Sequence, residues 1–390
     1  MHIGIDVSCW ANRRGFGRFT RELVGHLLAY QPDHRYSLFT DQSLQTTFTA
    51  DVSEINVAPA HTVNEKAVAH DRRRISDMLA FSRSVARVKP DVMYFPAVYS
   101  WFPLFPGTRS IVTFHDAIAE RFPELIFPTR ASRWAWRAKV NLAKWQADEY
   151  ITVSHAAQAE MTEHLNIDPQ RITVITEGFN TTFKPLDGMK IPGDLIHRYP
   201  FLNRPYLIYV GGIAPHKNLL GLLNGFLIAK DRGAVSDLKL VFVGDWGRDG
   251  FHENRSELDT LIAANPMLKS DVHFAGGIDD EGLRVLYGQA LAGVMPAFSE
   301  GFGLPAVEAM ACRTPVLASR AGSLPEVVGP GGLFFDPYDP ADIATQIEVI
   351  HSDQKLREHL AQAALKHVTQ FSWRRGVELL WPRLEALGES

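Results

Sequence analysis

Residues 292–319 read AGVMPAFSEGFGLPAVEAMACRTPVLAS, and this stretch decides the fold class. Its two ends, 292–298 and 314–319, are short apolar runs of the kind that form buried strands. Between them a glycine-rich turn leads to Pro305, a residue that suits the first turn of a helix. The stretch therefore predicts a strand, a helix and a second strand, which is the unit of a parallel α/β sheet.

The same alternation runs through the whole chain. The segment 19–30 between two such runs is amphipathic, since Phe19, Leu23 and Leu27 recur every four residues. The other runs that we expect to be strands are 2–8, 35–40, 91–96, 110–116, 149–154, 172–176, 206–212, 239–245 and 272–277. Strands that alternate with helical segments predict an α/β fold with parallel sheets.

The length of 390 residues is too great for one ordinary core, so we expect two domains. A stretch rich in Pro and Gly without periodicity lies between the two series of strands. We therefore predict a first domain over 1–184, a linker over 185–204 and a second domain over 205–370. The last segment, 371–390, is predicted to be an amphipathic helix.

Composition excludes several classes of protein. A net charge of −4 argues against nucleic-acid binding, and two cysteines far apart provide neither a disulfide framework nor zinc-ligand spacing. The N-terminus reads as a strand instead of a signal peptide. No apolar run approaches the roughly 18 to 20 residues of a spanning helix. These features predict a cytosolic protein, or one attached to the inner surface of a membrane.

Three loops after predicted strands are candidates for holding a diphosphate, because ligands of open α/β sheets bind beyond the carboxyl ends of strands. The first is Gly15-Phe16-Gly17-Arg18. A plain tight turn explains this segment about as well as an anion-binding loop does. The second, 211–218, places Lys217 behind a glycine turn. Alone, Lys217 would be read as a solvated surface lysine.

The third loop, 299–308, carries the most information. Gly301 and Gly303 leave the backbone amides accessible, and the helix that begins near Pro305 presents its positive end to an anion. Glu300 and Glu308 flank this site. A carboxylate beside a diphosphate is electrostatically unfavourable. Hydrogen bonds that it accepts from sugar or ribose hydroxyls would explain its presence. The alternative is two solvated acids at a helix start.

With these residues in place, the chain resembles a retaining family 4 glycosyltransferase, of the group 1 glycosyl transferases and mannosyltransferase-like. The resemblance rests on Glu300 and Glu308 with seven residues between them, and on the segments VGGIAPHKN, GRFTRELV, VTFHD, ITVSHAAQAEM, FAGGIDDEGLRVLY and LPEVVGPGGLFFDP. It implies the GT-B fold, in which two Rossmann-like domains face each other across a cleft. The first domain would take the acceptor, the second the nucleotide sugar, and the helix 371–390 would return to the first domain.

The resemblance also implies roles for individual residues. Glu300 and His115 correspond to groups that meet the transferred sugar, Lys217 to the phosphate-binding lysine, and Glu308 to the acid that binds ribose. The implied catalytic residues are therefore His115, Glu300 and Lys217, and the implied ribose ligand is Glu308. The implied donor-binding set is Gly15, Gly17, Gly212, Lys217, Gly276, Ile278, Glu300, Gly301, Phe302, Gly303, Leu304 and Glu308. A histidine at a strand end, taken alone, is as often a structural group.

One position departs from the family pattern. Many members carry an arginine where this chain has Gly212, so the second cation for the diphosphate is in question. His216 is the nearby basic candidate, and its charge near neutral pH depends on its surroundings. Arg18 and Arg320 are the other candidates.

The implied reaction is transfer of a hexose with retention, by attack on the face from which the diphosphate departs. Lysine and backbone dipoles suffice for a diphosphate, so we expect no metal and no cofactor. Asp279-Asp280-Glu281 reads as a helix start, where acids are favoured. The resemblance to mannosyltransferases favours GDP-mannose as the donor and a glycan or lipid-linked acceptor.

A basic stretch in the first half suggests a membrane contact. Projected as a helix, 130–145 places Arg130, Arg133, Arg137 and Lys144 on one face, beside an apolar arc of Trp134, Ala138, Leu142 and Trp145. The run Arg72-Arg73-Arg74 adds to the basic character of this half. The alternative is an ordinary surface helix whose tryptophans pack on the core of the first domain.

Two other functions remain open. A nucleotide-sugar epimerase shares this architecture, and a catalytically weak nucleotide-sugar-binding partner protein would fit the change at Gly212. A dehydrogenase does not fit, because no Gly-x-Gly-x-x-Gly fingerprint follows the first strand.

Overall fold

The computed structural model describes residues 1–12, 15–44, 46–57, 75–189, 191, 193–244 and 255–389. They form two compact units, Met1–Gly178 with Ser372–Ser390, and Phe179–Phe371. The stretch 185–204 therefore lies in the second unit, where Arg284 donates hydrogen bonds to the carbonyls of Lys184 and Pro185.

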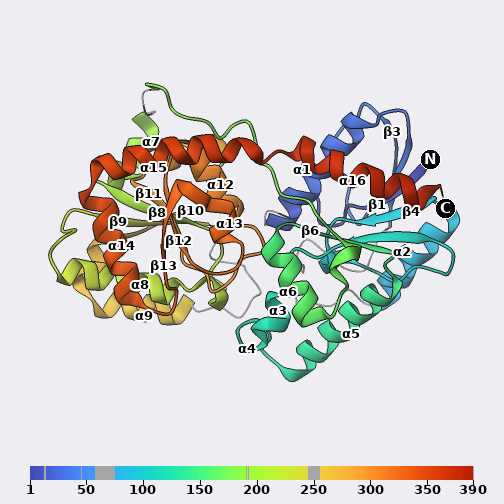
Figure 1. Cartoon of the computed structure of the whole chain (residues 1–390), viewed down its shortest axis with the longest axis horizontal. Coiled ribbons are helices and arrows are strands. Elements are labelled where there is room, and N and C mark those ends of the chain that lie inside the picture. The colour runs from blue at the N-terminus through green and yellow to red at the C-terminus, as the bar shows by residue number, and fades with distance from the viewer. Residues whose placement is uncertain are drawn as a thin grey trace. The chain divides into compact units, whose positions relative to one another are not determined.

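The first unit is built on a seven-stranded parallel sheet with strand order β3-β2-β1-β4-β5-β6-β7. Helices cover both faces of this sheet, and α1 lies beside α16 (Figure 1). The strands are β1 (His2–Asp6), β2 (Arg35–Thr40), β3 (Asp51–Asn56), β4 (Val92–Phe95), β5 (Arg109–Thr113), β6 (Glu149–Thr152) and β7 (Ile172–Val174). The helices are α1 (Gly15–Tyr30), α2 (Ile75–Val88), α3 (Ile118–Arg121), α4 (Pro123–Ile126), α5 (Arg130–Gln146), α6 (His155–Leu165) and α16 (Trp373–Gly388).

The second unit contains a six-stranded parallel sheet with order β10-β9-β8-β11-β12-β13. Its strands are β8 (Tyr206–Val210), β9 (Lys239–Val243), β10 (Val272–Gly276), β11 (Ala292–Met295), β12 (Val316–Ser319) and β13 (Gly332–Phe335). Its helices are α7 (Gly193–Arg198), α8 (Leu219–Asp231), α9 (Arg255–Ala264), α10 (Pro266–Asp271), α11 (Asp280–Gln289), α12 (Leu304–Ala311), α13 (Leu324–Val328), α14 (Pro340–Ser352) and α15 (Gln354–His367).

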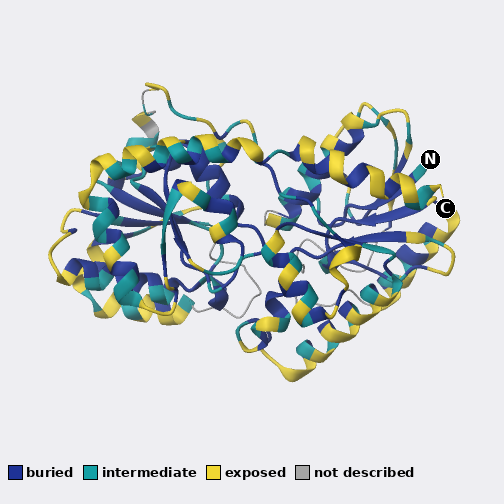
Figure 2. Ribbon diagram, viewed as in Figure 1, coloured by how far each residue is buried: buried dark blue, intermediate teal, exposed yellow. Residues whose placement is uncertain are grey.

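Burial explains why the central strands were predictable. β4, β5 and β8 are almost wholly buried, as is typical of parallel strands covered by helices on both faces (Figure 2). Phe19, Leu23 and Leu27 are buried in α1, as their four-residue repeat predicts.

Two edge strands, β3 and β13, were not predicted. β3 carries Asp51 and Glu54 and alternates between exposed and partly buried residues, and β13 is a four-residue strand that follows a glycine-rich turn. Edge strands are often short or charged, which hides them from a search for apolar runs.

Each sheet reverses its strand order at one point. In the first unit the reversal falls between β1 and β4, and in the second between β8 and β11. In open α/β sheets, ligands bind beyond the carboxyl ends of the strands at this switch point. The loops that follow β1, β4, β8 and β11 are therefore where a site is expected.

Candidate active site

In the second unit, hydrogen bonds join the loops that follow β8 and β11. The amide N–H of Phe298 donates to the carbonyl of His216 at 2.9 Å. Asn218, in the left-handed conformation at the start of α8, donates from Nδ2 to the carbonyls of Pro296 and Pro337, at 3.1 and 2.7 Å. The loop that carries Lys217 is thus fixed against the loop that carries Glu300.

Lys217 and Glu300 form an ion pair at this switch point. The Lys217 ammonium donates to both carboxylate oxygens of Glu300, at 2.8 and 2.7 Å, and the two side chains are 24% and 11% exposed. A charge-assisted bidentate contact of this kind holds both groups in a defined place. The structure therefore brings together the two residues that the sequence predicted separately.

The turn after Glu300 is held by Ser323. The hydroxyl of Ser323 donates to the carbonyls of Glu300 and Phe302, at 2.9 and 2.8 Å. Gly303 has a φ of +100° at the start of α12, a conformation that L side chains rarely adopt. A Cβ atom there would also lie 3.0 Å from Leu324. The glycine is thus required for the turn into α12, whose first N–H groups lack partners within the helix.

Glu308 lies in α12 and is 4% exposed. The hydroxyl of Tyr287 lies 3.4 Å from one of its carboxylate oxygens. Burial, and then the charge of Glu308, raises the pKa of the Cys312 thiol to about 12, so Cys312 is a protonated thiol. Its low exposure and its contact with Tyr287 make Glu308 an enclosed hydrogen-bond acceptor.

The surroundings of His216 do not favour it as the second cation. Its side chain is buried, and burial and then the charge of Lys217 lower its pKa well below the ordinary value of 6.5. The imidazole is therefore neutral near pH 7, which argues against His216 as the replacement for the missing arginine. At the position of the missing arginine, the carbonyl of Gly212 accepts a hydrogen bond from the Tyr209 hydroxyl at 2.6 Å.

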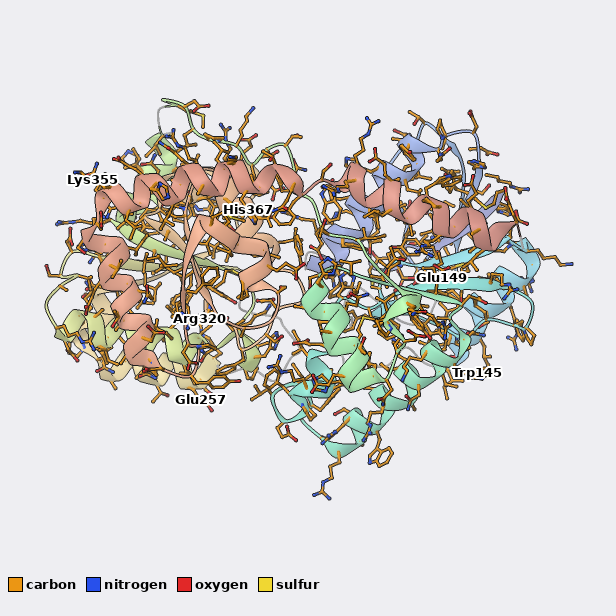
Figure 3. The ribbon with its side chains drawn as sticks, viewed as in Figure 1. Trp145, Glu149, Glu257, Arg320, Lys355 and His367 are labelled. Atoms are coloured by element: carbon orange, nitrogen blue, oxygen red, sulfur yellow. The ribbon has the colours of Figure 1, made fainter. Side chains whose placement is uncertain are left out.

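The other candidate cation of this unit, Arg320, is exposed and follows β12 (Figure 3). Its guanidinium donates to the carbonyl of Phe334 at 3.1 Å. Arg18, in α1, belongs to the first unit.

Gly276 is the last residue of β10 and Ile278 follows it. β10 lies two strands from β8. The spacing of adjacent strands, about 4.8 Å, separates the ends of β8 and β10 by about 10 Å. Gly276 has a φ of +73° and accepts a hydrogen bond from Gly244 at 3.1 Å. Asp279 caps α11 by accepting from the amide of Gly282, so the acidic run at 279–281 is a helix start as predicted.

In the first unit, His115 follows β5 and is 8% exposed. Its Nε2 lies 3.0 Å from the carbonyl of Pro96, which can only accept, so Nε2 carries a hydrogen. Its Nδ1 faces Glu177 at 3.6 Å, and Phe19 packs edge-on at 4.7 Å between ring centres. The imidazole is held on three sides. Nothing in the local sequence indicated Glu177 as a partner, because it lies 62 positions away along the chain.

Gly15 and Gly17 belong to α1, which begins at Gly15 and not at Phe19 as expected. A Cβ atom at Gly17 would lie 2.1 Å from the carbonyl oxygen of Asn12, so only glycine allows this close approach. At the end of β1, Asp6 accepts from Ser8 at 2.6 Å, while its other carboxylate oxygen is buried without a hydrogen-bond partner. Asp6 is a polar group at the switch point that the sequence analysis missed.

The predicted basic face is only partly present on α5. Lys144 points to the carbonyl of Leu165, and Arg133 lies 3.6 Å from Glu124. The expectation that the tryptophans pack on the core is wrong for Trp134 and Trp145, which are exposed.

Arg72, Arg73 and Arg74 lie outside the described residues. Within the described ranges, no helix is both long and apolar enough to cross a membrane. In the same ranges, no three His, Cys, Asp or Glu side chains cluster as a metal site would require.

Comparison with known proteins decides the family. A model described as "Glycosyltransferase Family 4" matches residues 13–183, and one described as "Glycosyl transferases group 1" matches residues 198–367. O-antigen chain mannosyltransferase B of Escherichia coli is 30% identical over 267 residues, which is 68% of this chain and 67% of that protein. The chain belongs to these glycosyltransferases.

Other relatives of this glycosyltransferase carry similar names. Serotype-specific mannosyltransferase WbdA of E. coli is 25% identical over 96% of this chain and 46% of its own length. MMP alpha-(1->4)-mannosyltransferase of Mycolicibacterium hassiacum is 30% identical over 62% of this chain. The match to that protein covers 57% of its length, so the chain spans about half of these two relatives.

Solved structures establish that the glycosyltransferase has the GT-B fold. Sucrose-phosphate synthase of Thermosynechococcus elongatus matches with a TM-score of 0.76 and 21% identity, over 99% of each chain. Anabaena HepE, solved with UDP-glucose, matches with a TM-score of 0.73 and 19% identity, over 99% of this chain and 100% of that one. The α/β architecture therefore agrees with the expected fold.

Proposed function

We propose that this glycosyltransferase transfers a hexose, with mannose favoured, from a nucleotide diphosphate sugar to a glycan or lipid-linked acceptor with retention of configuration. The observation that carries the proposal is the Lys217–Glu300 pair, fixed beside the start of α12 at the switch point of the second sheet. The names of the relatives, O-antigen chain mannosyltransferase B and WbdA, support mannose and therefore GDP-mannose.

Departure of the diphosphate requires positive potential where negative charge develops. Lys217 supplies a full charge there, and the first N–H groups of α12 supply a partial one. When the diphosphate binds, it competes with Glu300 for the Lys217 ammonium. The exchange leaves the carboxylate of Glu300 available to accept hydrogen bonds from the hydroxyls of the transferred sugar.

In the proposed reaction, the bond between the anomeric carbon and the diphosphate oxygen breaks, and the acceptor oxygen bonds to that carbon from the same face. The acceptor hydroxyl gives its proton to the departing diphosphate, so no covalent enzyme intermediate forms. The family resemblance further assigns His115, which Pro96 and Glu177 hold in place, to orient the sugar, and Glu308 to accept a hydrogen bond from the ribose.

We also propose that the reaction needs no metal ion. Lys217 and the start of α12 provide the electrostatic stabilisation that a divalent cation supplies in other nucleotide-sugar enzymes.

A catalytically weak binding partner is the second candidate, and one observation favours it. The family resemblance implies an arginine where this chain has Gly212, and the buried His216, whose pKa is lowered, is a poor substitute for that charge. Diphosphate stabilisation would then rest on Lys217 and the start of α12, which suits binding better than turnover. An epimerase would convert the donor without any acceptor.

The test is a panel of GDP-mannose, UDP-glucose, UDP-galactose and UDP-N-acetylglucosamine. Each is assayed for thermal stabilisation of the protein and for release of nucleoside diphosphate, with and without a chelator of divalent ions. We expect GDP-mannose to stabilise the protein and to release GDP at a rate that the chelator leaves unchanged. NMR of the glycosylated product should show the anomeric configuration of the donor.

Each other outcome removes a defined part of the proposal. Loss of release in chelator rejects metal independence, and an inverted product rejects retention. Stabilisation without release supports the binding partner, and interconversion of the donor sugar supports the epimerase.

A further inference from the structure

One face of α5 is anchored firmly in the first unit. Ser132, Trp136, Val140 and Ala143 are buried, and the Trp136 ring stacks on Tyr99 with centroids 5.4 Å apart. A capping box between Thr129 and Ser132 fixes the start of the helix. Because packing determines which side of α5 faces the core, it also determines which residues lie on the opposite side.

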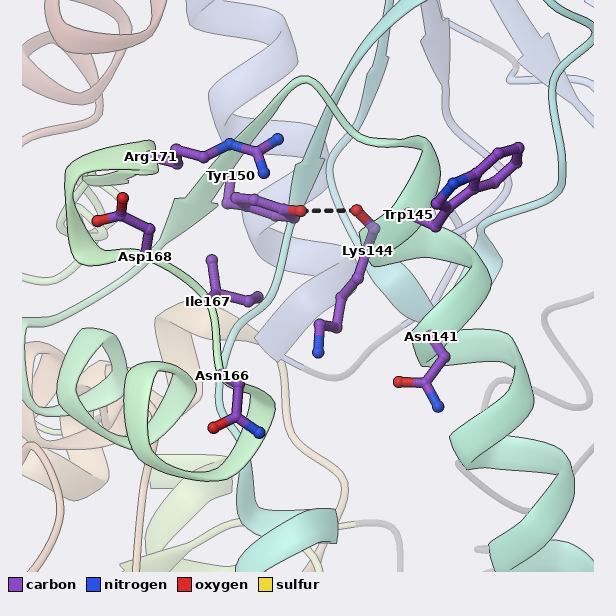
Figure 4. A pocket seen from close by; sticks show the side chains of 8 residues that line it. All are labelled: Asn141, Lys144, Trp145, Tyr150, Asn166, Ile167, Asp168 and Arg171. Atoms are coloured by element: carbon purple, nitrogen blue, oxygen red, sulfur yellow. Dashed lines mark hydrogen bonds between the residues drawn. The ribbon is translucent and has the colours of Figure 1, made fainter.

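The opposite face of α5 is apolar and exposed. Trp134, Leu142 and Trp145 are 69%, 52% and 83% exposed, and Ala138 lies between them on the same side of the helix. The spacing of these residues, three and four apart, is that of one helix face. Figure 2 colours much of α5 as exposed, and Figure 4 shows Trp145 pointing away from Tyr150 and Arg171. Large apolar side chains gathered in this way mark an interaction surface.

The charge of this helix has one sign. α5 contains five basic residues and no acidic one. Lys139 and Lys144 donate to the carbonyls of Tyr99 and Leu165. Arg130 and Arg137 lie on the exposed side, and the guanidinium of Arg137 is 5.7 Å from the Trp134 ring. The exposed apolar face is therefore edged by positive charge, which complements an anionic partner.

We propose that this face, which consists of Arg130, Trp134, Arg137, Ala138, Leu142 and Trp145, docks on the surface of an anionic lipid bilayer. Tryptophan favours the boundary between headgroups and acyl chains, where its ring is apolar and its N–H meets water. Arginines beside it are attracted to anionic headgroups. A helix with these two features lies in the plane of the interface. The docking itself is independent of the proposed transfer reaction, although it would bring a lipid-linked acceptor to the first unit.

A pocket lined by two cations lies at the end of the docking face. It has a volume of about 410 Å³, and Asn141, Lys144 and Trp145 of α5 contribute to its lining. Its wall carries Lys144 and Arg171, the amide of Asn166 and one acid, Asp168 (Figure 4). Lys144 donates to the carbonyl of Leu165, and Arg171 to the carbonyls of Ala147 and Asp148. While they keep these contacts, the two cations add positive potential at this end of the docking face.

Co-sedimentation with vesicles tests the proposal. The full chain is mixed with vesicles of phosphatidylglycerol and phosphatidylcholine, or of phosphatidylcholine alone. We expect binding to the anionic vesicles, with weakening at high salt because exposed charges are screened. Arg130→Glu with Arg137→Glu should weaken this binding more than tenfold, since each arginine near an anionic surface contributes about fivefold. Trp134→Ser with Trp145→Ser should weaken it at least as much.

Matched controls make comparable charge reversals and apolar-to-serine changes elsewhere. Lys355→Glu with Lys366→Glu reverses two exposed lysines of α15, and Ile75→Ser with Leu379→Ser removes two exposed apolar side chains. These variants should sediment with anionic vesicles as the unchanged protein does. Circular dichroism and nucleotide binding in solution, measured on all variants, show that folding and the donor site are intact.

Three results would overturn the proposal: no binding to anionic vesicles, equal binding of the α5 variants and the controls, or equal binding to both vesicle types. Self-association that the Trp134→Ser and Trp145→Ser changes abolish, without vesicle binding, would assign the face to a second copy of the chain. Failure of the transfer reaction leaves vesicle binding unaffected, so the two proposals fail separately.

Discussion

Glu120 is a carboxyl group enclosed between helices of the first unit. Burial raises its pKa from 4.5 to about 7, and it accepts a hydrogen bond from the Trp136 indole at 2.7 Å. Between these two pH values the folded protein binds a proton that the unfolded chain lacks. The contribution of Glu120 to the free energy of unfolding should therefore fall as the pH rises from about 4.5 to about 7 and then remain level.

Glu120→Gln should remove this pH dependence, because the amide oxygen still accepts from Trp136. We expect the variant to exceed the unchanged protein in free energy of unfolding by on the order of 2 kcal/mol near pH 8, and to match it near pH 4.5. Urea denaturation at the two pH values measures this. Glu124→Gln, at an exposed acid of α4, is the control and should show no such difference. A constant offset for Glu120→Gln at both pH values would contradict the assignment.

Sequence reasoning at this scale succeeded where a residue type and its spacing decide the outcome. Lys217, Glu300 and the glycine turn follow strands that an apolar run reveals, so their meeting at a switch point could be expected. The neutrality of His216 could not, since it depends on how deeply the loop after β8 is buried. The contact between His115 and Glu177 depends on which loops the sheet brings together.

The turn into α12 is the element on which the candidate site depends. Gly303→Ala places a side chain at a φ of +100° and 3.0 Å from Leu324. We expect a loss of about 1–3 kcal/mol in the free energy of unfolding, together with weaker binding of nucleotide sugar, because the adjoining Glu300 turn must shift. Urea denaturation and calorimetry measure the two effects.

Gly193→Ala provides the control for this element. A Cβ atom there meets nothing within 4 Å and the backbone is not left-handed, so the change should stay within about 0.5 kcal/mol. Equal behaviour of the two variants would show that the turn does not require glycine.

α5 illustrates what periodicity can and cannot decide. The helical repeat predicted which side chains share a face, and Trp134, Ala138, Leu142 and Trp145 do lie on one exposed face. It could not determine which face the core takes, because the sequence offers Trp136 and Trp134 as equally apolar. Long side chains such as Lys144 also reach back to a nearby carbonyl, which a helical projection ignores.

At the scale of the whole molecule, both units follow the same plan. Each has a parallel sheet with one reversal of strand order, and the candidate donor-site residues Lys217 and Glu300 follow β8 and β11, the strands that flank the reversal in the second unit. The alternation of apolar runs and amphipathic segments made this plan predictable, since buried parallel strands are continuous apolar runs. The edge strands β3 and β13 escaped because an edge carries charge or is very short.

The most direct test of the account is calorimetric binding of GDP and GDP-mannose to the unchanged protein and to Lys217→Met. Lys355→Met, at an exposed lysine of α15, is the matched control (Figure 3). Removing one charge-assisted contact to the diphosphate, and leaving Glu300 unpaired beside it, should weaken both ligands by about tenfold to a hundredfold. The control should bind as the unchanged protein does. Equal affinity of all three proteins for GDP would contradict the claim that Lys217, Glu300 and the start of α12 form the donor site.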